Sequence, residues 1–192
     1  CIRDRLKSDS SIIEALNNID TRILLSKMPL DISKTPLSIA PGYKQRAIDL
    51  LTQGDFNDLW KSPSINFQLY WDNFADVPPV FSSSWYDSYT RANIENYVAL
   101  SKRNKGPYRL IMGSWLHGDL TMADTSSGNI DLGPKAPINY NEERLRWFDH
   151  WLKEIDNGVE KDKEVRLFTM GKGNGLKNID GRLNHGGYWR EE

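Results

Sequence analysis

The 192-residue sequence has one cysteine, no long apolar run and almost no net charge. The single cysteine, Cys1, excludes a disulfide within the chain and says little about compartment. Lys and Arg total 25 against 26 Asp and Glu, so the formal charge of −1 gives no electrostatic reason to expect nucleic-acid binding. No apolar run approaches the roughly 18 residues that span a bilayer. These absences predict a soluble protein, cytoplasmic or secreted, without a membrane span.

Aromatic residues, in contrast, are plentiful, with seven Trp and eight Tyr. Such rings most often supply core and interface packing, because each buries a large apolar area. A sugar-binding surface is the sharper alternative, and composition alone does not decide between the two. The three histidines have no zinc-ligand spacing, and the sequence predicts neither a cofactor nor a metal site.

Residues 1–60 lack strand alternation and show the apolar spacing of short helices. One helix is predicted around Ile13 and Leu16, a second over 43–53 and a third over 55–60. Isolated helices of this length are only marginally stable and need tertiary packing. A helical lid and a structural subdomain fit this segment equally well. The chain does not begin with Met, and a piece cut from a longer chain is the simplest interpretation.

Residues 80–113 predict a strand, a helix and a second strand. The run 80–84 consists of apolar and small residues, 90–102 has helical spacing, and 108–113 contains a continuous apolar run typical of burial on both faces. Strand, helix and strand at this spacing form a βαβ unit, whose two strands are parallel.

Asp87 and His117 each follow one of these predicted strands. Open α/β sheets bind ligands at the carboxyl ends of their strands, so both side chains are expected at that edge. An acid that orients a histidine and a histidine that removes a proton are two members of a hydrolytic triad. The third member, a serine in Gly-x-Ser-x-Gly, occurs nowhere in the sequence. From spacing alone, a turn aspartate and a hydrogen-bonded histidine explain the pair more simply.

The other candidate residues have simpler interpretations. The serines at 82–84 and Ser114 lie near the same edge but outside an elbow motif, so we interpret them as small residues at strand ends. His150 is expected to pack beside tryptophans in a helix, and His185 to lie in a turn.

A strong amphipathic helix is predicted over 141–155. Leu145, Phe148 and Leu152 line one face of it, with Trp147 widening the apolar stripe. The helix is therefore expected to pack on the sheet through this stripe.

Two motifs resemble those of the CocE/NonD hydrolases, relatives of the X-Pro dipeptidyl-peptidases and of cocaine esterase. Trp85-Tyr86-Asp87 is similar to the family's acid motif Gly-Trp-Tyr-Asp, and the segment 113–118 is similar to its histidine motif Gly-Pro-Trp-x-His-Gly. Further similar segments follow in the family's order: 131–134, 146–153, 156–158, 165–171 and 186–190. The resemblance therefore spans residues 77–190.

The resemblance implies an α/β fold class: a partial α/β-hydrolase fold with a helical cap segment and the start of a C-terminal β (jelly-roll) domain. It assigns 1–75 to the cap region, 76–160 to the C-terminal part of the hydrolase domain and 161–192 to the jelly-roll domain. It implies Asp87 as the triad acid and His117 as the general base of a serine hydrolase. The implied substrates are small-molecule esters or peptides, X-Pro peptides among them.

The sequence also departs from the family pattern. Ser83 and Ser84 replace glycines before the acid motif, and Ser114 replaces a proline. Each change exchanges one small residue for another and removes no catalytic group. The nucleophilic serine and the oxyanion-hole tyrosine of the family are not matched, so the isolated chain is expected to be inactive. The alternative hypotheses are a non-catalytic module that binds carbohydrate or a protein partner, and a degenerate hydrolase relative.

Overall fold

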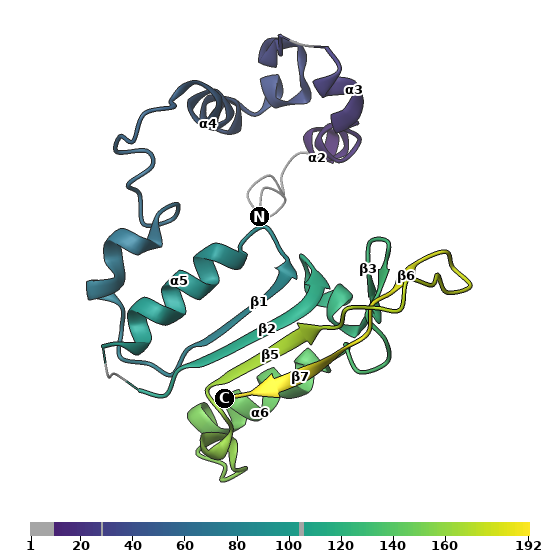
Figure 1. The fold of residues 1–192 in the computed structure, drawn as a ribbon. Helices are drawn as coiled ribbons and strands as arrows, with labels where there is room; N and C mark the ends of the chain where they lie inside the picture. The colour runs from purple at the N-terminus through teal and green to yellow at the C-terminus, as the bar shows by residue number, and fades with distance from the viewer. Residues whose placement is uncertain (1–9, 28, 104–105) are drawn as a thin grey trace. The chain divides into compact units, whose positions relative to one another are not determined.

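The structure, a computed structural model, describes residues 10–27, 29–103 and 106–192 (Figure 1). Cys1 and its neighbours up to residue 9 lie outside these ranges. The chain divides into two compact units, residues 1–66 and 67–192. Among the described residues, no helix has the length and apolar character needed to cross a membrane.

The first unit is built from short helices. These are α2 (Ser10–Asn17), α3 (Thr21–Leu25) and α4 (Pro41–Thr52), with the 3₁₀ helices η1 (Ile32–Lys34) and η2 (Pro36–Ile39) between them. Proline at the start of α4 suits that position, because its missing N–H would have no helical partner there. The helices predicted around Leu16 and over 43–53 are confirmed.

The third predicted helix, over 55–60, is wrong, since this segment forms turns. The Asn57 side chain accepts a hydrogen bond from the Leu59 N–H, and the Trp60 indole N–H donates to the Gln53 carbonyl over 2.6 Å. Asn side chains that bond to their own backbone favour turns over helices, which explains the difference.

Few side chains are buried in the first unit. Among its described residues, only Thr35 and Ala40 are buried, while Leu51 of α4 is 66% exposed and Phe56 is 60% exposed. These helices therefore bury little apolar surface within their own unit, as their shortness led us to expect.

The second unit is organised around a four-stranded sheet of order β1-β2-β5-β7. Its strands are β1 (Val80–Tyr86), β2 (Arg109–Leu116), β5 (Val165–Met170) and β7 (Gly187–Glu191). The first three are parallel, and β7 is antiparallel to β5. Helix α5 (Thr90–Ser101) connects β1 to β2, which confirms the predicted βαβ unit.

The two faces of the sheet carry separate cores. On one face, Phe81, Leu110 and Met112 pack with Leu100 of α5. On the other face, Ile111 packs with residues that include Trp115 and Trp189, and Tyr140 of α6 (Tyr140–Lys153) packs against this group. Alternation along β2 therefore separates the two cores, as burial on both faces requires.

A second, small sheet follows His117 in the chain. It contains β3 (Ser126–Ser127), β4 (Ile130–Asp131) and β6 (Leu183–Asn184) in that order. The remaining short elements are η3 (Phe67–Asn73), η4 (Asp119–Ala123) and η5 (Val159–Lys161). The segment after His117 therefore contains η4, β3 and β4, and it pairs through β4 with the C-terminal strand β6.

Strand β5 belongs to the same sheet as β1 and β2. Val165 pairs with Leu110 and Leu167 with Met112, although residues from 161 onward were expected to begin a separate β-rich domain. A mixed α/β unit is thus present, and no jelly-roll domain is seen within the described ranges. The domain boundaries 1–75, 76–160 and 161–192 stay predictions.

Helix α6 packs on the sheet through a different face from the predicted one. Trp147 is 7% exposed, and its indole N–H donates to the Pro78 carbonyl over 3.1 Å. Leu145, Phe148 and Leu152 are 57%, 51% and 74% exposed, so their predicted packing on the sheet is wrong. The apolar stripe of α6 is wide and contains Trp147 on one side and Phe148 on the other. The side with Trp147, the larger ring, is the one that is buried.

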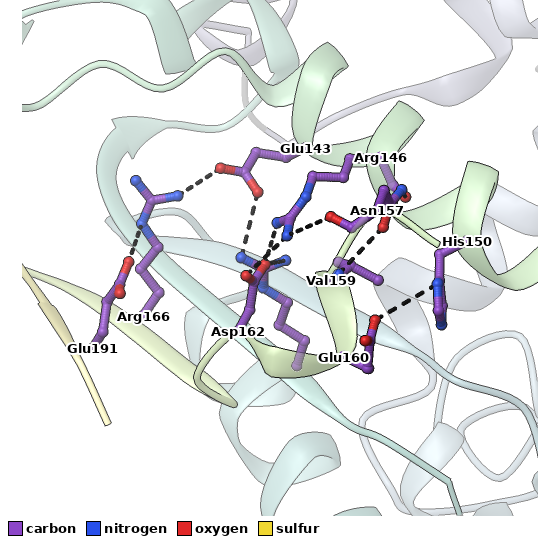
Figure 2. A network of polar contacts seen from close by, with 10 residues as sticks. Glu143, Arg146, His150, Asn157, Val159, Glu160, Asp162, Arg166 and Glu191 are labelled. Carbon is purple, nitrogen blue, oxygen red and sulfur yellow. Dashed lines mark hydrogen bonds and ion pairs between the residues drawn. The ribbon is translucent and has the colours of Figure 1, made fainter. Parts of the chain in front are cut away.

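Ion pairs connect α6 to the sheet. The Arg109 side chain, only 8% exposed, lies 3.0 Å from Asp162 and 3.4 Å from Glu143 of α6. Figure 2 shows Arg146 on the same Asp162, which accepts two hydrogen bonds from its guanidinium, and Arg166 of β5 donating to Glu143 over 2.6 Å. We call these five residues the α6 network. The hydrogen bond to Asp162 raises the pKa of Arg146.

Candidate active site

Asp87 and His117 lie at the carboxyl ends of adjacent parallel strands. Tyr86, the last residue of β1, pairs in register with Leu116, the last residue of β2. Each candidate residue is therefore the first one after its strand, and the two loops begin side by side. The sequence prediction placed both side chains at this edge, and the structure places them there.

The two side chains are in contact. His117 Nδ1 lies 3.2 Å from Asp87 Oδ1 and 3.3 Å from Oδ2. The Asp87 side chain is 11% exposed and that of His117 is 65% exposed, so the acid is largely covered and the imidazole faces solvent. When Nδ1 carries the proton and donates it to the carboxylate, Nε2 carries the lone pair and can accept a proton.

The Asp87 carboxylate is oriented by its own loop. Its Oδ1 accepts a hydrogen bond from the Tyr89 backbone N–H over 2.8 Å, which is an Asx turn. The Thr90 hydroxyl donates to the Asp87 carbonyl over 2.7 Å and also to the Ser84 carbonyl, at the start of α5. Local hydrogen bonds thus hold the acid in place independently of His117.

The His117 loop is shaped by a glycine and a threonine. Gly118 has a φ of +113°, a backbone conformation that side-chain-bearing residues rarely adopt. The Thr121 hydroxyl lies 2.8 Å from both the Leu116 and the Gly118 carbonyls. The Tyr89 ring lies 5.3 Å from the imidazole, centre to centre, and is tilted by 57°.

Sequence reasoning missed Tyr89, Thr90 and Thr121 as supports of the pair. The signal for the hydroxyls is local, since threonines a few residues beyond a strand end often bond backbone carbonyls. No comparable signal exists for the ring contact of Tyr89 with His117, because it joins residues 28 positions apart.

The serines at this edge are parts of the strands. Ser83, Ser84 and Ser114 are 1%, 0% and 2% exposed and lie inside β1 and β2 rather than at the strand ends where they were expected. The Ser84 hydroxyl donates to the Trp115 carbonyl and so connects the ends of β1 and β2. Gly113 is required beside Trp115, because a Cβ there would lie 1.9 Å from the indole ring.

The other two histidines lie elsewhere. His150 Nδ1 is 3.0 Å from the Ile155 carbonyl, and its ring meets Trp151 edge-on at 4.5 Å, which confirms the packing interpretation. His185 donates its backbone N–H to the Asp131 carbonyl over 2.8 Å. Within the described ranges, no group of three or more His, Cys, Asp or Glu side chains could hold a metal ion.

No protein-family model matches the sequence. It is similar to two curated proteins described as "putative serine esterase", one from Mycobacterium bovis and one from Mycobacterium tuberculosis, each 30% identical over 116 residues. The match covers 57% of this chain and 17% of each relative, so the chain corresponds to a small part of their length. The similarity is to serine esterases in general and distinguishes no subtype.

Proposed function

We propose that this chain contributes the acid and the base of a serine hydrolase of the CocE/NonD type, which cleaves ester or amide bonds, X-Pro peptide bonds among them. The observation that carries the proposal is the contact of His117 Nδ1 with the Asp87 carboxylate, 3.2 Å away, at the ends of adjacent parallel strands. The similarity to two serine esterases supports the reaction class.

In the proposed mechanism, Asp87 accepts the Nδ1–H of His117 and keeps Nε2 available as a base. Nε2 removes the proton of a serine hydroxyl, and the serine oxygen attacks the substrate carbonyl carbon. The protonated imidazole then gives its proton to the departing alcohol or amine, which leaves an acyl-serine. A water molecule, deprotonated by Nε2, hydrolyses this acyl group, and the serine recovers its proton from His117.

The nucleophile is proposed to come from a part of the protein outside these 192 residues. The sequence contains no Gly-x-Ser-x-Gly, and Ser83, Ser84 and Ser114 are buried in the strands. The matched relatives are much longer than the aligned region, which is 17% of their length. Asp87 and His117 are thus proposed to work only in a longer polypeptide.

The test is hydrolysis of 4-nitrophenyl acetate by the polypeptide that carries this sequence together with the serine elbow. His117→Ala is expected to lower kcat/KM by about 10³-fold or more, because the base takes part in both proton transfers. Asp87→Asn is expected to lower kcat by about 10³–10⁴-fold, since an amide does not hold the required tautomer. The matched control is His150→Ala, which should retain activity, and an unchanged rate in His117→Ala would refute the assignment.

A non-catalytic binding module is the second candidate, favoured by exposed rings at the carboxyl edge. Tyr89 is 58% exposed and Tyr188 is 52% exposed. However, five of the seven indole N–H groups donate to other groups of the chain, so most of the tryptophans have a structural explanation: Trp60, Trp71, Trp85, Trp147 and Trp189. Saturable polysaccharide binding that Tyr89→Ala abolishes would favour this candidate.

A further inference from the structure

Three exposed apolar side chains lie at the ends of three neighbouring parallel strands. Tyr86 ends β1, Leu116 ends β2 and Met170 ends β5, and they are 36%, 42% and 40% exposed. Tyr86 and Leu116 are register partners, and the Tyr86 hydroxyl lies 3.5 Å from the Met170 sulfur. These residues therefore form one continuous surface, which we call the carboxyl-edge patch.

The strands beneath the patch are held together by cross-strand contacts. The Trp85 indole N–H donates to the Phe168 carbonyl over 2.7 Å, which connects the end of β1 to β5. Met170 pairs with Gly187 of β7, which connects the end of β5 to the next strand. The patch is thus presented by paired strands, which makes it a surface of defined shape.

The position of the patch connects it with the candidate active site. Tyr86 immediately precedes Asp87, and Leu116 immediately precedes His117. Two of the three patch residues are therefore the immediate chain neighbours of Asp87 and His117, and a group bound on the patch lies beside the pair. Single exposed apolar residues need no explanation, but a contiguous group beside a reactive pair is typical of a ligand-binding surface.

The chemistry of the three side chains limits what can bind there. A phenol ring, an isobutyl group and a thioether offer apolar contact, ring stacking and sulfur–aromatic contact, and none of them carries a charge. A phosphate, a carboxylate or an ammonium group would lose its hydration on this surface without gaining an ionic partner. An aryl or branched alkyl group is the matching ligand chemistry.

We propose that the carboxyl-edge patch binds the aryl or branched alkyl group of an ester or amide substrate and places the scissile carbonyl beside His117. This inference rests on the proposed function, because the adjacent pair is what makes a substrate the occupant. It adds a substrate class, apolar esters and amides, to the reaction assigned to Asp87 and His117.

The test uses the 192-residue chain labelled with ¹³C in its methionine methyl groups. The probe is propiophenone, an aryl ketone that has the carbonyl of an ester and cannot be hydrolysed. NMR titration is expected to shift the Met170 methyl signal saturably. The signals of Met112 and Met122 serve as internal controls, since these residues are 0% and 7% exposed and should not shift. Acetone, which lacks the ring, should give no saturation over the same concentrations.

Two variants locate the binding site of the ketone. Leu116→Ser should weaken propiophenone binding about three- to tenfold, because a partly exposed leucine would otherwise be covered by the ligand. Leu152→Ser is the matched control on α6, where the leucine is 74% exposed, and it should bind with unchanged affinity. Tyr86→Gln provides a second patch variant, and an unchanged Met112 signal verifies that each variant is folded.

Three outcomes would overturn the inference: no saturable Met170 shift, equal affinity in both patch variants and the wild type, or a Met170 signal that changes with chain concentration and not with ketone. The last would mean that a second copy of the chain covers the patch. His117→Ala should bind propiophenone within twofold of the wild type. If propiophenone does not bind but ester hydrolysis by the longer polypeptide still requires His117, only this inference is refuted. If that hydrolysis does not require His117, the proposed function is refuted.

Discussion

Two groups of charged side chains in the second unit differ in where they lie and in what they can do. The Asp87–His117 pair is at the carboxyl ends of β1 and β2, with the imidazole 65% exposed. The α6 network lies between α6 and the sheet, where the Arg109 side chain is 8% exposed. A solvent-facing imidazole can exchange protons with a substrate, whereas a covered guanidinium, charged at all ordinary pH values, can only hold its partners.

The difference lies in the basic partner, since Arg109 is 8% exposed and His117 is 65% exposed, whereas Asp87, at 11%, is covered more than Asp162, at 25%. Breaking a buried pair leaves a charge without a partner in a region of low polarity, and this costs more than the pair contributed. Breaking an exposed pair costs little, because water replaces the lost partner. The network should therefore control stability, and the exposed pair should control chemistry.

The largest stability effect is expected from Asp162→Ala, which removes the carboxylate shared by Arg109 and Arg146. The free energy of unfolding should fall by about 2 kcal/mol, since two guanidinium groups lose their shared carboxylate while Arg109 keeps Glu143 as a partner. Urea denaturation followed by tryptophan fluorescence measures this change. The matched control is Asp156→Ala, an exposed aspartate on the same loop, which should stay within about 0.5 kcal/mol of the wild type. Equal effects of the two substitutions would contradict a structural role for the network.

A smaller loss of stability is expected at alkaline pH, where the uncharged phenol of Tyr97 loses its proton. Burial, and then the neighbouring Glu164, raise the pKa of Tyr97, whose hydroxyl lies 3.4 Å from Glu164 Oε2. Because the pKa is higher in the folded state, the stabilising contribution of the protonated phenol is complete below the unfolded value of about 10 and is lost as the pH rises through the folded value.

Urea midpoints at pH 8 and pH 10.5 measure this loss. The wild type should lose stability between the two pH values, and Tyr97→Phe should lose less. Tyr188→Phe, at a tyrosine that is 52% exposed, should retain the full alkaline decrease. If Tyr97→Phe shows the same decrease as the wild type, the contact with Glu164 is not its cause.

The exposed pair should matter little for stability. Asp87→Asn is expected to change the free energy of unfolding by about 1 kcal/mol or less, because the His117 partner is largely solvated. The same urea measurement tests this. A loss as large as that of Asp162→Ala would place the pair with the structural ion pairs and would weaken its assignment to catalysis.

The smallest expected effect is that of His117→Ala on the isolated chain. Without a nucleophile the 192-residue chain should hydrolyse 4-nitrophenyl acetate no faster than this variant does. The rate of 4-nitrophenol release, measured at equal concentrations of the wild-type chain and of His117→Ala, tests this. Appreciable turnover by the chain that disappears in His117→Ala would mean that it contains a nucleophile after all.

Much of the candidate site could be predicted from sequence, because local signals define it. The apolar runs and helical spacing around 80–113 predicted a parallel βαβ unit, and this placed Asp87 and His117 at one edge of a sheet. Their contact also depends on the register that pairs Tyr86 with Leu116, which only the structure shows. Their roles in catalysis stay a proposal.

The errors arose where a pattern allowed more than one packing. The stripe on α6 contained both the leucines and Trp147, and periodicity does not tell which side of a wide stripe faces the sheet. Likewise, residues 161–192 were assigned to a separate β domain, whereas β5 pairs with β2. Partner choice depends on residues far away in sequence, which a local pattern does not contain.

The sequence by itself therefore determined the βαβ unit and helix α6 and placed Asp87 and His117 after consecutive strands, because these features depend on neighbouring residues. Only the tertiary structure decided which side chains are covered. It enclosed Arg109 between α6 and the sheet and left His117 facing solvent. Exposure is a property of the assembled layers, and it separates the pair proposed to react from the ion pairs that stabilise the fold.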